Sequence, residues 1–157
     1  MRKKGMLIGL LLALALVGVM AAPVMGQDSD TQVIGVVAGY VDVTAPGDID
    51  LGTMDIGENP GSSTGSVASN TDWEVTASDQ KDVNAGYMTT ATGQRLTNKF
   101  QISPDGRTFS DADTDITYTG SGNASIALYV NQVVDAADPP GTYSITITFV
   151  GSIYPGE

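Results

Sequence analysis

Hydrophobic and polar residues alternate with a period of two over several short stretches of the chain. The clearest stretch is 141–153, where apolar residues hold one parity and serines and threonines largely hold the other. This pattern is typical of a β-strand that buries one face and exposes the opposite face. The apolar set consists of Tyr143, Ile145, Ile147, Phe149 and Ile153.

The same period predicts further strands, separated by residues that favour turns. In 71–78, Trp73, Val75 and Ala77 point to one side, and 103–106 ("SPDG") is a turn sequence. The stretch 57–66, rich in Gly, Ser and Asn, is predicted to be a loop. The other predicted strands are 48–56 with a bend at Gly52, 95–102 with Leu96, Phe100 and Ile102 inward, 116–119, and 125–134 with Ile126, Leu128 and Val130 inward.

The strand pattern also sets the fold class. No amphipathic helical pattern continues for three turns in the region after residue 26. Seven or eight short strands with regular turn signals are typical of an antiparallel sandwich. The sequence therefore predicts an all-β domain, a Greek-key or immunoglobulin-like β-sandwich.

The first strand-like stretch, "TQVIGVVAGYVDV" (31–43), is apolar on both faces. A sheet with one solvated side would leave half of these residues in water. The strand is therefore either buried centrally in its own domain or donated to the sheet of a neighbouring molecule. One parity holds Val33, Val37, Val41 and Val43, and the other holds Ile34, Val36, Ala38 and Tyr40.

Residues 1–26 have the layout of a secretory signal peptide. Cations at 2–4 precede an apolar run over 6–20, and Val24 and Gly26 are small enough for a cleavage site. Cleavage there would leave one domain, 27–157, with 27–44 as the candidate donor strand. Two alternatives stay open: residues 6–25 could be retained as a membrane anchor, or a cut after Gly5 could leave an apolar helix as a filament core.

Charge and composition exclude several function classes. The 157-residue chain contains no Cys and no His, which removes Ser-His-Asp and Cys-His catalysis, His- or Cys-based zinc sites and disulfides. Removal of the cations at 2–4 takes the formal net charge from −11 to −14. Such a surface repels nucleic acid and anionic lipid. The sequence does not predict an enzyme.

The stretch "DADTD" is the candidate metal site. Asp111, Asp113 and Asp115 alternate, and carboxylates in a loop can turn toward one Ca²⁺. The EF-hand spacing is absent, because Ile116 and Gly122 stand where that loop has Gly and Glu. The alternative is an acidic, solvated edge that discourages pairing with other strands.

Two more residues are candidates for surface chemistry. Trp73 is the single Trp and could stack on a glycan, but its alternation with Val75 and Ala77 favours a place in the core. Asn123 begins the sequon "NAS", an N-glycosylation acceptor only in a source that glycosylates secreted proteins.

Two segments together carry a resemblance to known proteins. Residues 49–79 combine a Leu-Gly pair, a Gly/Ser-rich stretch and the spacing Asn70-x-x-Trp73-x-Val75, and residues 138–152 place a Pro-Gly turn before a terminal strand. The combination resembles secreted β-sandwich proteins of archaeal and bacterial cell surfaces, including WxL-like and pilin-like fibre subunits. Val75 stands where the WxL pattern has Leu. The resemblance implies a structural or adhesive role at the cell surface.

These observations favour an extracellular, non-enzymatic subunit of a filament, pilus or surface layer. It would form homo-oligomers by N-terminal strand donation, with a cell-envelope or glycan partner and no membrane span once the signal is cleaved. The alternative is a monomeric secreted module that binds glycan or Ca²⁺ through Trp73 or through the three aspartates, with no other cofactor. The expected donor residues are Val33, Ile34, Val36, Val37, Val41 and Val43.

Overall fold

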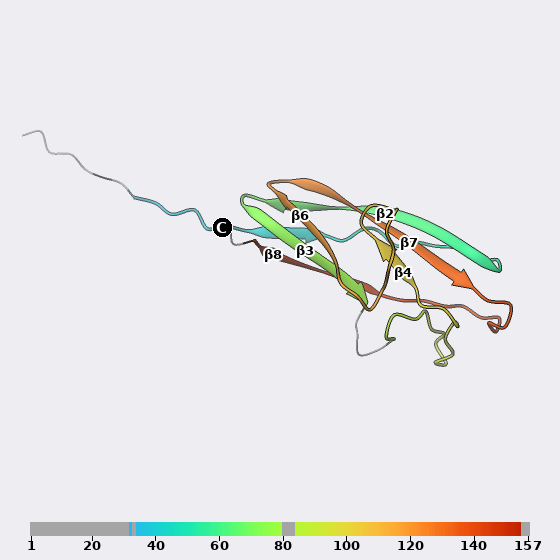
Figure 1. Ribbon diagram of the computed structural model, residues 1–157. Coiled ribbons are helices and arrows are strands. Elements are labelled where there is room, and N and C mark those ends of the chain that lie inside the picture. The colour runs from blue at the N-terminus through green and yellow to red at the C-terminus, as the bar shows by residue number, and fades with distance from the viewer. Residues whose placement is uncertain (1–31, 33, 80–83, 155–157) are drawn as a thin grey trace, which may run out of the picture. The chain divides into compact units, whose positions relative to one another are not determined.

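The computed structural model describes residues 32, 34–79 and 84–154 (Figure 1). The chain divides into two units, Met1–Val36 and Val37–Glu157. The signal peptide and its two alternatives concern residues outside the described part. Within the described residues, no helix has the length and apolar character needed to cross a bilayer.

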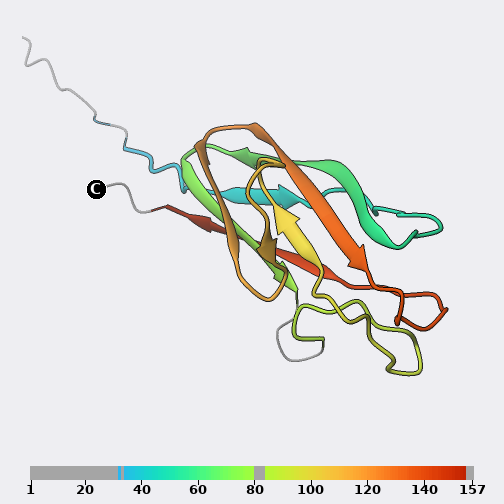
Figure 2. The same cartoon turned by 45° about the vertical axis from the view of Figure 1, so that its right-hand side comes forward.

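The second unit is built from antiparallel strands in two sheets (Figures 1 and 2). The described residues form one sheet with the order β1-β2-β7-β4-β5 and a second with the order β6-β3-β8. This confirms the all-β antiparallel sandwich. The strands are β1 Val41–Thr44, β2 Gly57–Ser69, β3 Asp72–Asp79, β4 Gln101–Ser103, β5 Ser110–Asp111, β6 Ile116–Ser121, β7 Ala124–Val134 and β8 Ile147–Ile153.

The predicted loop at 57–66 is wrong, because these residues belong to β2. β2 pairs with β7 from Gly57↔Val134 to Val67↔Ala124. Its glycines allow another chain segment to pack closely against it. A Cβ on Gly61 would lie 2.7 Å from Ile49 Cγ2, and one on Gly65 would clash with the carbonyl oxygen of Thr44. Small residues are needed where the chain after β1 crosses the inner face of β2.

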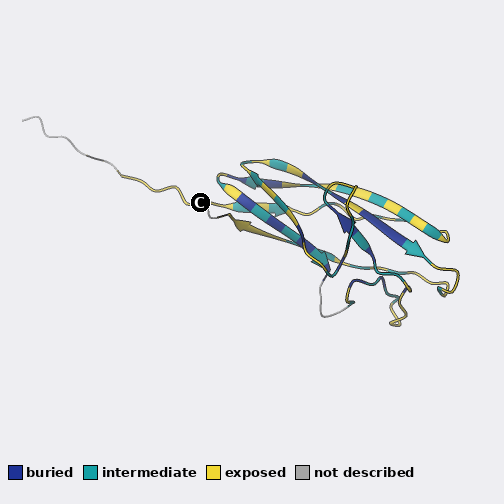
Figure 3. Ribbon diagram, viewed as in Figure 1, coloured by how far each residue is buried: buried dark blue, intermediate teal, exposed yellow. Residues whose placement is uncertain are grey.

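The buried residues lie between the two sheets, as the dark-blue bands of Figure 3 show. The strand predicted at 71–78 is confirmed as β3, with every second residue buried. One cluster of the core surrounds Ile102, and a smaller one surrounds Trp73. Tyr118 packs against both clusters, and its hydroxyl donates to Ala127 O at 2.8 Å. Burial raises the pKa of this phenol to about 12.

Four predicted strands are shorter in the structure or absent. Of residues 141–153, only Ile147–Ile153 form a strand, β8. Residues 48–56 form no strand, although Gly52 adopts φ of 64° as the predicted bend requires. Residues 95–102 contribute only the start of β4, because the N–H groups of Leu96 and Phe100 donate to Met88 and Gly86 in the preceding loop. Of residues 31–43, those that the structure describes contribute only β1, which begins at Val41. The inward positions Leu96, Phe100 and Ile102 are confirmed as buried.

Candidate functional site

The candidate site lies between the free edges of the two sheets. β1 is at one edge of the larger sheet, and β8 is at one edge of the smaller sheet. The two strands meet at Gly151, where a Cβ would lie 2.5 Å from Val43 Cγ2 and 3.2 Å from Val41 Cγ1. This close approach closes the sandwich at one end of β8. Beyond it, the chain segments that continue from the two edges separate.

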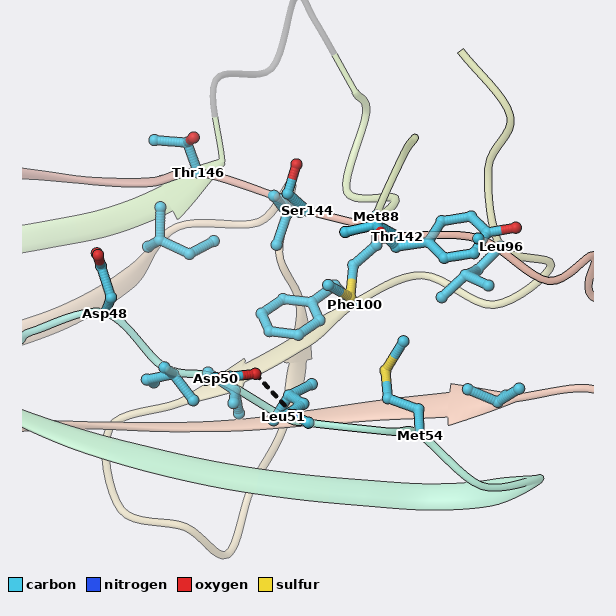
Figure 4. Close-up of a pocket in the computed structure, with 18 of the residues that line it drawn as sticks. Asp48, Asp50, Leu51, Met54, Met88, Leu96, Phe100, Thr142, Ser144 and Thr146 are labelled. Carbon is cyan, nitrogen blue, oxygen red and sulfur yellow. Dashed lines mark hydrogen bonds between the residues drawn. The ribbon is translucent and has the colours of Figure 1, made fainter. Parts of the chain in front are cut away.

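A groove of about 910 Å³, with an apolar floor and both apolar and polar side chains in its lining, opens where they separate. One wall is segment 45–56, which follows β1, and the other is segment 142–149, which leads into β8. In Figure 4, Met88 and Phe100 lie between the wall that carries Leu51 and the wall that carries Ser144. The apolar groove residues are Ile49, Leu51 and Met54 on the first wall, Tyr143, Ile145, Ile147 and Phe149 on the second, and Met88, Leu96, Phe100, Leu128 and Val130 below.

The floor of the groove is the main hydrophobic core itself. Leu96 and Val130 are each 1% exposed, whereas the apolar residues of both walls are only half-buried. Half-buried apolar residues on both walls mean that the core lacks a cover here. Apolar surface left in this way is typical of a binding groove rather than of a finished sandwich.

The groove walls also present backbone that an added strand could pair with. Among the described residues, no ladder joins 45–56 to another strand. Segment 142–149 pairs with β3 through the start of β8 and, at Ser144, forms one isolated bridge with Thr89. Residues 142–149 alternate between half-buried and exposed side chains, as an edge strand does. Their extended length is ~26 Å at ~3.3 Å per residue. An extended peptide of about eight residues would therefore fit along this wall by β-augmentation.

Hydrogen bonds to one carboxylate tie together two loops at the end of the groove. The backbone N–H and the hydroxyl of Thr97 donate to Asp138 Oδ1 at 2.8 and 2.7 Å. The N–H of Asp135 donates to Asp138 Oδ2 at 2.7 Å. Burial acts to raise the pKa of Asp138, but these hydrogen bonds outweigh it and leave the pKa below its ordinary value.

This carboxylate predicts an acid-sensitive contribution to stability. Its pKa is lower in the folded state than in the unfolded state, so the contribution is present above about pH 3.9 and is lost as the pH falls through the folded value. Asp138→Asn should lower the melting temperature at neutral pH and flatten its decline on acidification. Thr97→Val, which removes one donor, should act in the same direction in thermal unfolding at stepwise pH. Unchanged profiles for both variants would contradict this role.

The expected donor residues fall into two groups. Val41 and Val43 lie in β1, where they pair with Ser69 and Val67 and pack against the smaller core cluster. These two valines are thus committed to their own domain in this structure. Among residues 34–37, Ile34, Val36 and Val37 are 76%, 93% and 86% exposed and form no strand. Val33 lies outside the described residues.

The aspartates of the predicted metal site contact a cation of the chain. Lys99 Nζ lies 2.6 Å from Asp113 Oδ2 and 3.7 Å from Asp111 Oδ2. The hydrogen bond to Asp113 is the main cause that raises the pKa of Lys99. In the part of the chain that the structure describes, no group of three acidic, His or Cys side chains has an arrangement suited to a metal ion, and Asp115 does not complete one.

The other two candidates lie at the closed end of the sandwich. Trp73 is 2% exposed, and its Nε1–H donates to Gly122 O at 2.8 Å, so its ring is not available to stack on a ligand. Asn123 is exposed in the turn between β6 and β7, and its Oδ1 accepts from the N–H of Ser69 at 3.0 Å.

Sequence reasoning missed the groove. It assigned the alternating residues of 142–149 to a finished core and did not identify 45–56 as a wall. The signal was present but ambiguous, because a wall residue such as Ile145 follows the same alternation as a core residue. Which strands become sheet edges depends on pairing, and pairing is not visible in one sequence.

No protein-family model and no curated protein matches this sequence. In fold, the chain is similar to a chain of a solved structure, the chaperone–tip adhesion subunit pre-assembly complex from the archaic chaperone–usher Csu pili of Acinetobacter baumannii. The TM-score is 0.51 and the identity is 18%, over 74% of this chain and 40% of that chain. The matched region therefore spans less than half of the other chain, and the likeness concerns the fold alone.

Proposed function

We propose that the chain is a non-enzymatic, extracellular subunit of a surface filament or layer, and that its groove binds the N-terminal segment of a second copy. The observation that carries this proposal is the groove between two sheet edges, whose apolar floor has no cover among the described residues. An inserted strand would bury apolar side chains against the floor and would pair with the walls. Residues 1–26 would be removed on secretion, so that the mature chain begins at Gln27.

The same chain supplies a segment with the properties of the missing strand. Ile34, Val36 and Val37 are apolar and almost fully exposed, which costs free energy unless another surface covers them. Fully extended, the eight residues 29–36 would span ~26 Å, the same length as the wall formed by 142–149. A second copy is favoured over another protein because one sequence contains both complementary parts.

The side-chain pattern indicates which face of the segment enters the groove. Ile34, Val36 and Ala38 share one parity, whereas the other parity is interrupted by Gly35 and Gly39. The first set places larger side chains against the floor, and the glycines face outward, where no side chain is needed. We therefore assign Ile34 and Val36 to the groove.

The fold likeness supports this proposal at the level of architecture. The solved structure belongs to a pilus system, and its title describes a chaperone bound to a tip adhesion subunit before assembly. The resemblance of residues 49–79 and 138–152 to surface-fibre subunits points to the same class. Adhesion to a cell-envelope or glycan partner would be a property of the assembled fibre.

The donor face can be tested by replacing its two aliphatic residues. The double variant Ile34→Thr/Val36→Thr should assemble at least about 100-fold more weakly than the wild type. Each buried aliphatic side chain contributes about 1.5–3 kcal/mol, and 1.4 kcal/mol corresponds to tenfold in affinity. Light scattering of the mature protein, before and after heating in detergent, measures the assembled fraction. The wild type should form multimers that dissociate only on heating.

Val37→Thr is the matched control, because Val37 lies on the opposite face of the segment. It should assemble within a few-fold of the wild type. A wild type that stays monomeric at high concentration would contradict strand donation. It would favour the monomeric secreted module, for which a melting temperature raised by Ca²⁺ or by a glycan is the corresponding measurement.

A further inference from the structure

Asn70 holds the chain immediately before β1 with two side-chain hydrogen bonds. Its Oδ1 accepts from the N–H of Tyr40 at 2.9 Å, and its Nδ2 donates to the carbonyl oxygen of Ala38 at 3.0 Å. These are the two backbone groups that flank Gly39. We refer to this pair of bonds as the Asn70 bracket. Asn70 was part of the Asn-x-x-Trp pattern in the sequence, and the groove does not use it.

The bracket extends the β1–β2 pairing beyond its last ladder position. The ladder ends at Val41↔Ser69, and Ser69 Oγ donates to Tyr40 O at 2.7 Å. The amide of Asn70 then continues the pairing by one more step, as the peptide group of a neighbouring strand would. Residues 38–40 are therefore held in an extended path in line with β1.

This path leads away from the groove. A Cβ on Gly39 would lie 3.2 Å from Ile153 Cδ1 and 3.4 Å from Thr71 Cγ2, which places residue 39 beside the last residue of β8. The groove wall extends no further along that strand than Phe149. Phe149 and Ile153 are ~13 Å apart at ~3.3 Å per residue. Val37 thus leaves the domain at the end opposite the groove.

We infer that Asn70 is a positioning residue that prevents the N-terminal segment from entering its own groove, so that the groove stays open for a second copy. This inference rests on the proposed function. Without the bracket, Gly39 could form a turn, and residues 27–37 could fold back along the domain. Insertion within one chain would then have the advantage of a high effective concentration. The bracket opposes this reversal by fixing the two peptide groups on either side of the turn.

The test is a peptide-capture measurement on full mature chains. A dye-labelled peptide of residues 27–40 is added to the monomeric fraction of the wild type and of Asn70→Ala. The wild-type monomer should capture the peptide, whereas Asn70→Ala should give more monomer and capture at least about tenfold less. Each lost hydrogen bond should change the equilibrium between the open chain and the self-inserted chain by about fivefold. The melting temperature of the Asn70→Ala monomer should not fall, because its own segment covers the groove. A purely structural role for Asn70 would instead lower it.

Two further variants make the result decisive. Asn123→Ala removes an Asn side-chain hydrogen bond to Ser69 at the same end of the domain without touching residues 38–40, and it should behave as the wild type. Asn70→Asp keeps the acceptor for Tyr40 and loses the donor to Ala38, so its peptide capture should fall between that of the wild type and that of Asn70→Ala. If Asn70→Ala does not fold, the comparison of Asn70→Asp with the wild type tests the inference. Equal capture by the wild type and the Asn70 variants would overturn the inference. Failure of every chain to capture the peptide would instead overturn the proposed function.

Discussion

Two variants that each fail to assemble should form a dimer when they are mixed. The first, Ile34→Thr/Val36→Thr, has a disabled segment and an intact groove. The second, Ile145→Asp, has an intact segment and a charge on the groove wall, where an inserted strand would bury it unpaired. In the mixture, the segment of the second variant can enter only the groove of the first. The expected product contains one copy of each and does not grow further.

The mixing experiment distinguishes strand donation from non-specific aggregation. Size-exclusion chromatography with light scattering should show monomer for each variant alone and a dimer mass only after mixing. Thr148→Asp is the matched control for the wall, because Thr148 is exposed on the same segment and does not line the groove, and this variant should assemble as the wild type. Dimers or larger species from either disabled variant alone would contradict the assignment of segment and groove.

Replacement of Trp73 by alanine should cost about 3–5 kcal/mol of unfolding free energy. The indole fills the smaller core cluster with Val67, Val75 and Ile126, and its Nε1–H bonds to a backbone carbonyl. The ring also packs directly on β6, where a Cβ on Gly120 would lie 2.6 Å from Trp73 Cζ2. Removal leaves a cavity between the sheets as well as an unpaired carbonyl. Chemical denaturation followed by circular dichroism measures the loss.

The effect should depend on burial rather than on loss of an aromatic ring. Tyr154→Ala, at a residue that is 46% exposed near the end of β8, is the control and should change the unfolding free energy much less. A Trp73→Ala variant that keeps wild-type stability and loses glycan binding would instead restore Trp73 as a ligand platform.

The part of the fold that follows from alternation could be predicted, and the part that depends on pairing could not. Trp73, Val75 and Ala77 alternate with polar residues, and the structure buries all three. The stretch 57–66 has few apolar residues and several glycines, so its local preference indicates a loop. It becomes the longest described strand because β7 provides a continuous partner and because the glycines admit segment 45–51. That segment comes from elsewhere in the chain, so local propensity does not reveal it.

The candidate site, like the fold, could be predicted from the sequence only in part. The apolar character of 31–43 on both faces was visible, and it raised the question of a neighbouring molecule. The structure places Val41 and Val43 in the sheet of their own domain and leaves Ile34, Val36 and Val37 exposed. The boundary between these two roles lies at residues 38–40. It is set by the side chain of Asn70, about thirty residues away, and no periodicity in the segment indicates it.

The Asn70 bracket has a consequence for the mechanics of an assembled fibre. In such a fibre, residues up to Val36 would be held by one subunit, while residues 38–40 are held by their own. Only Val37 would remain between the two attachments, which is too short to act as a flexible hinge. Successive subunits would then keep a nearly fixed angle, and the fibre would bend as a stiff rod with a persistence length of many subunits.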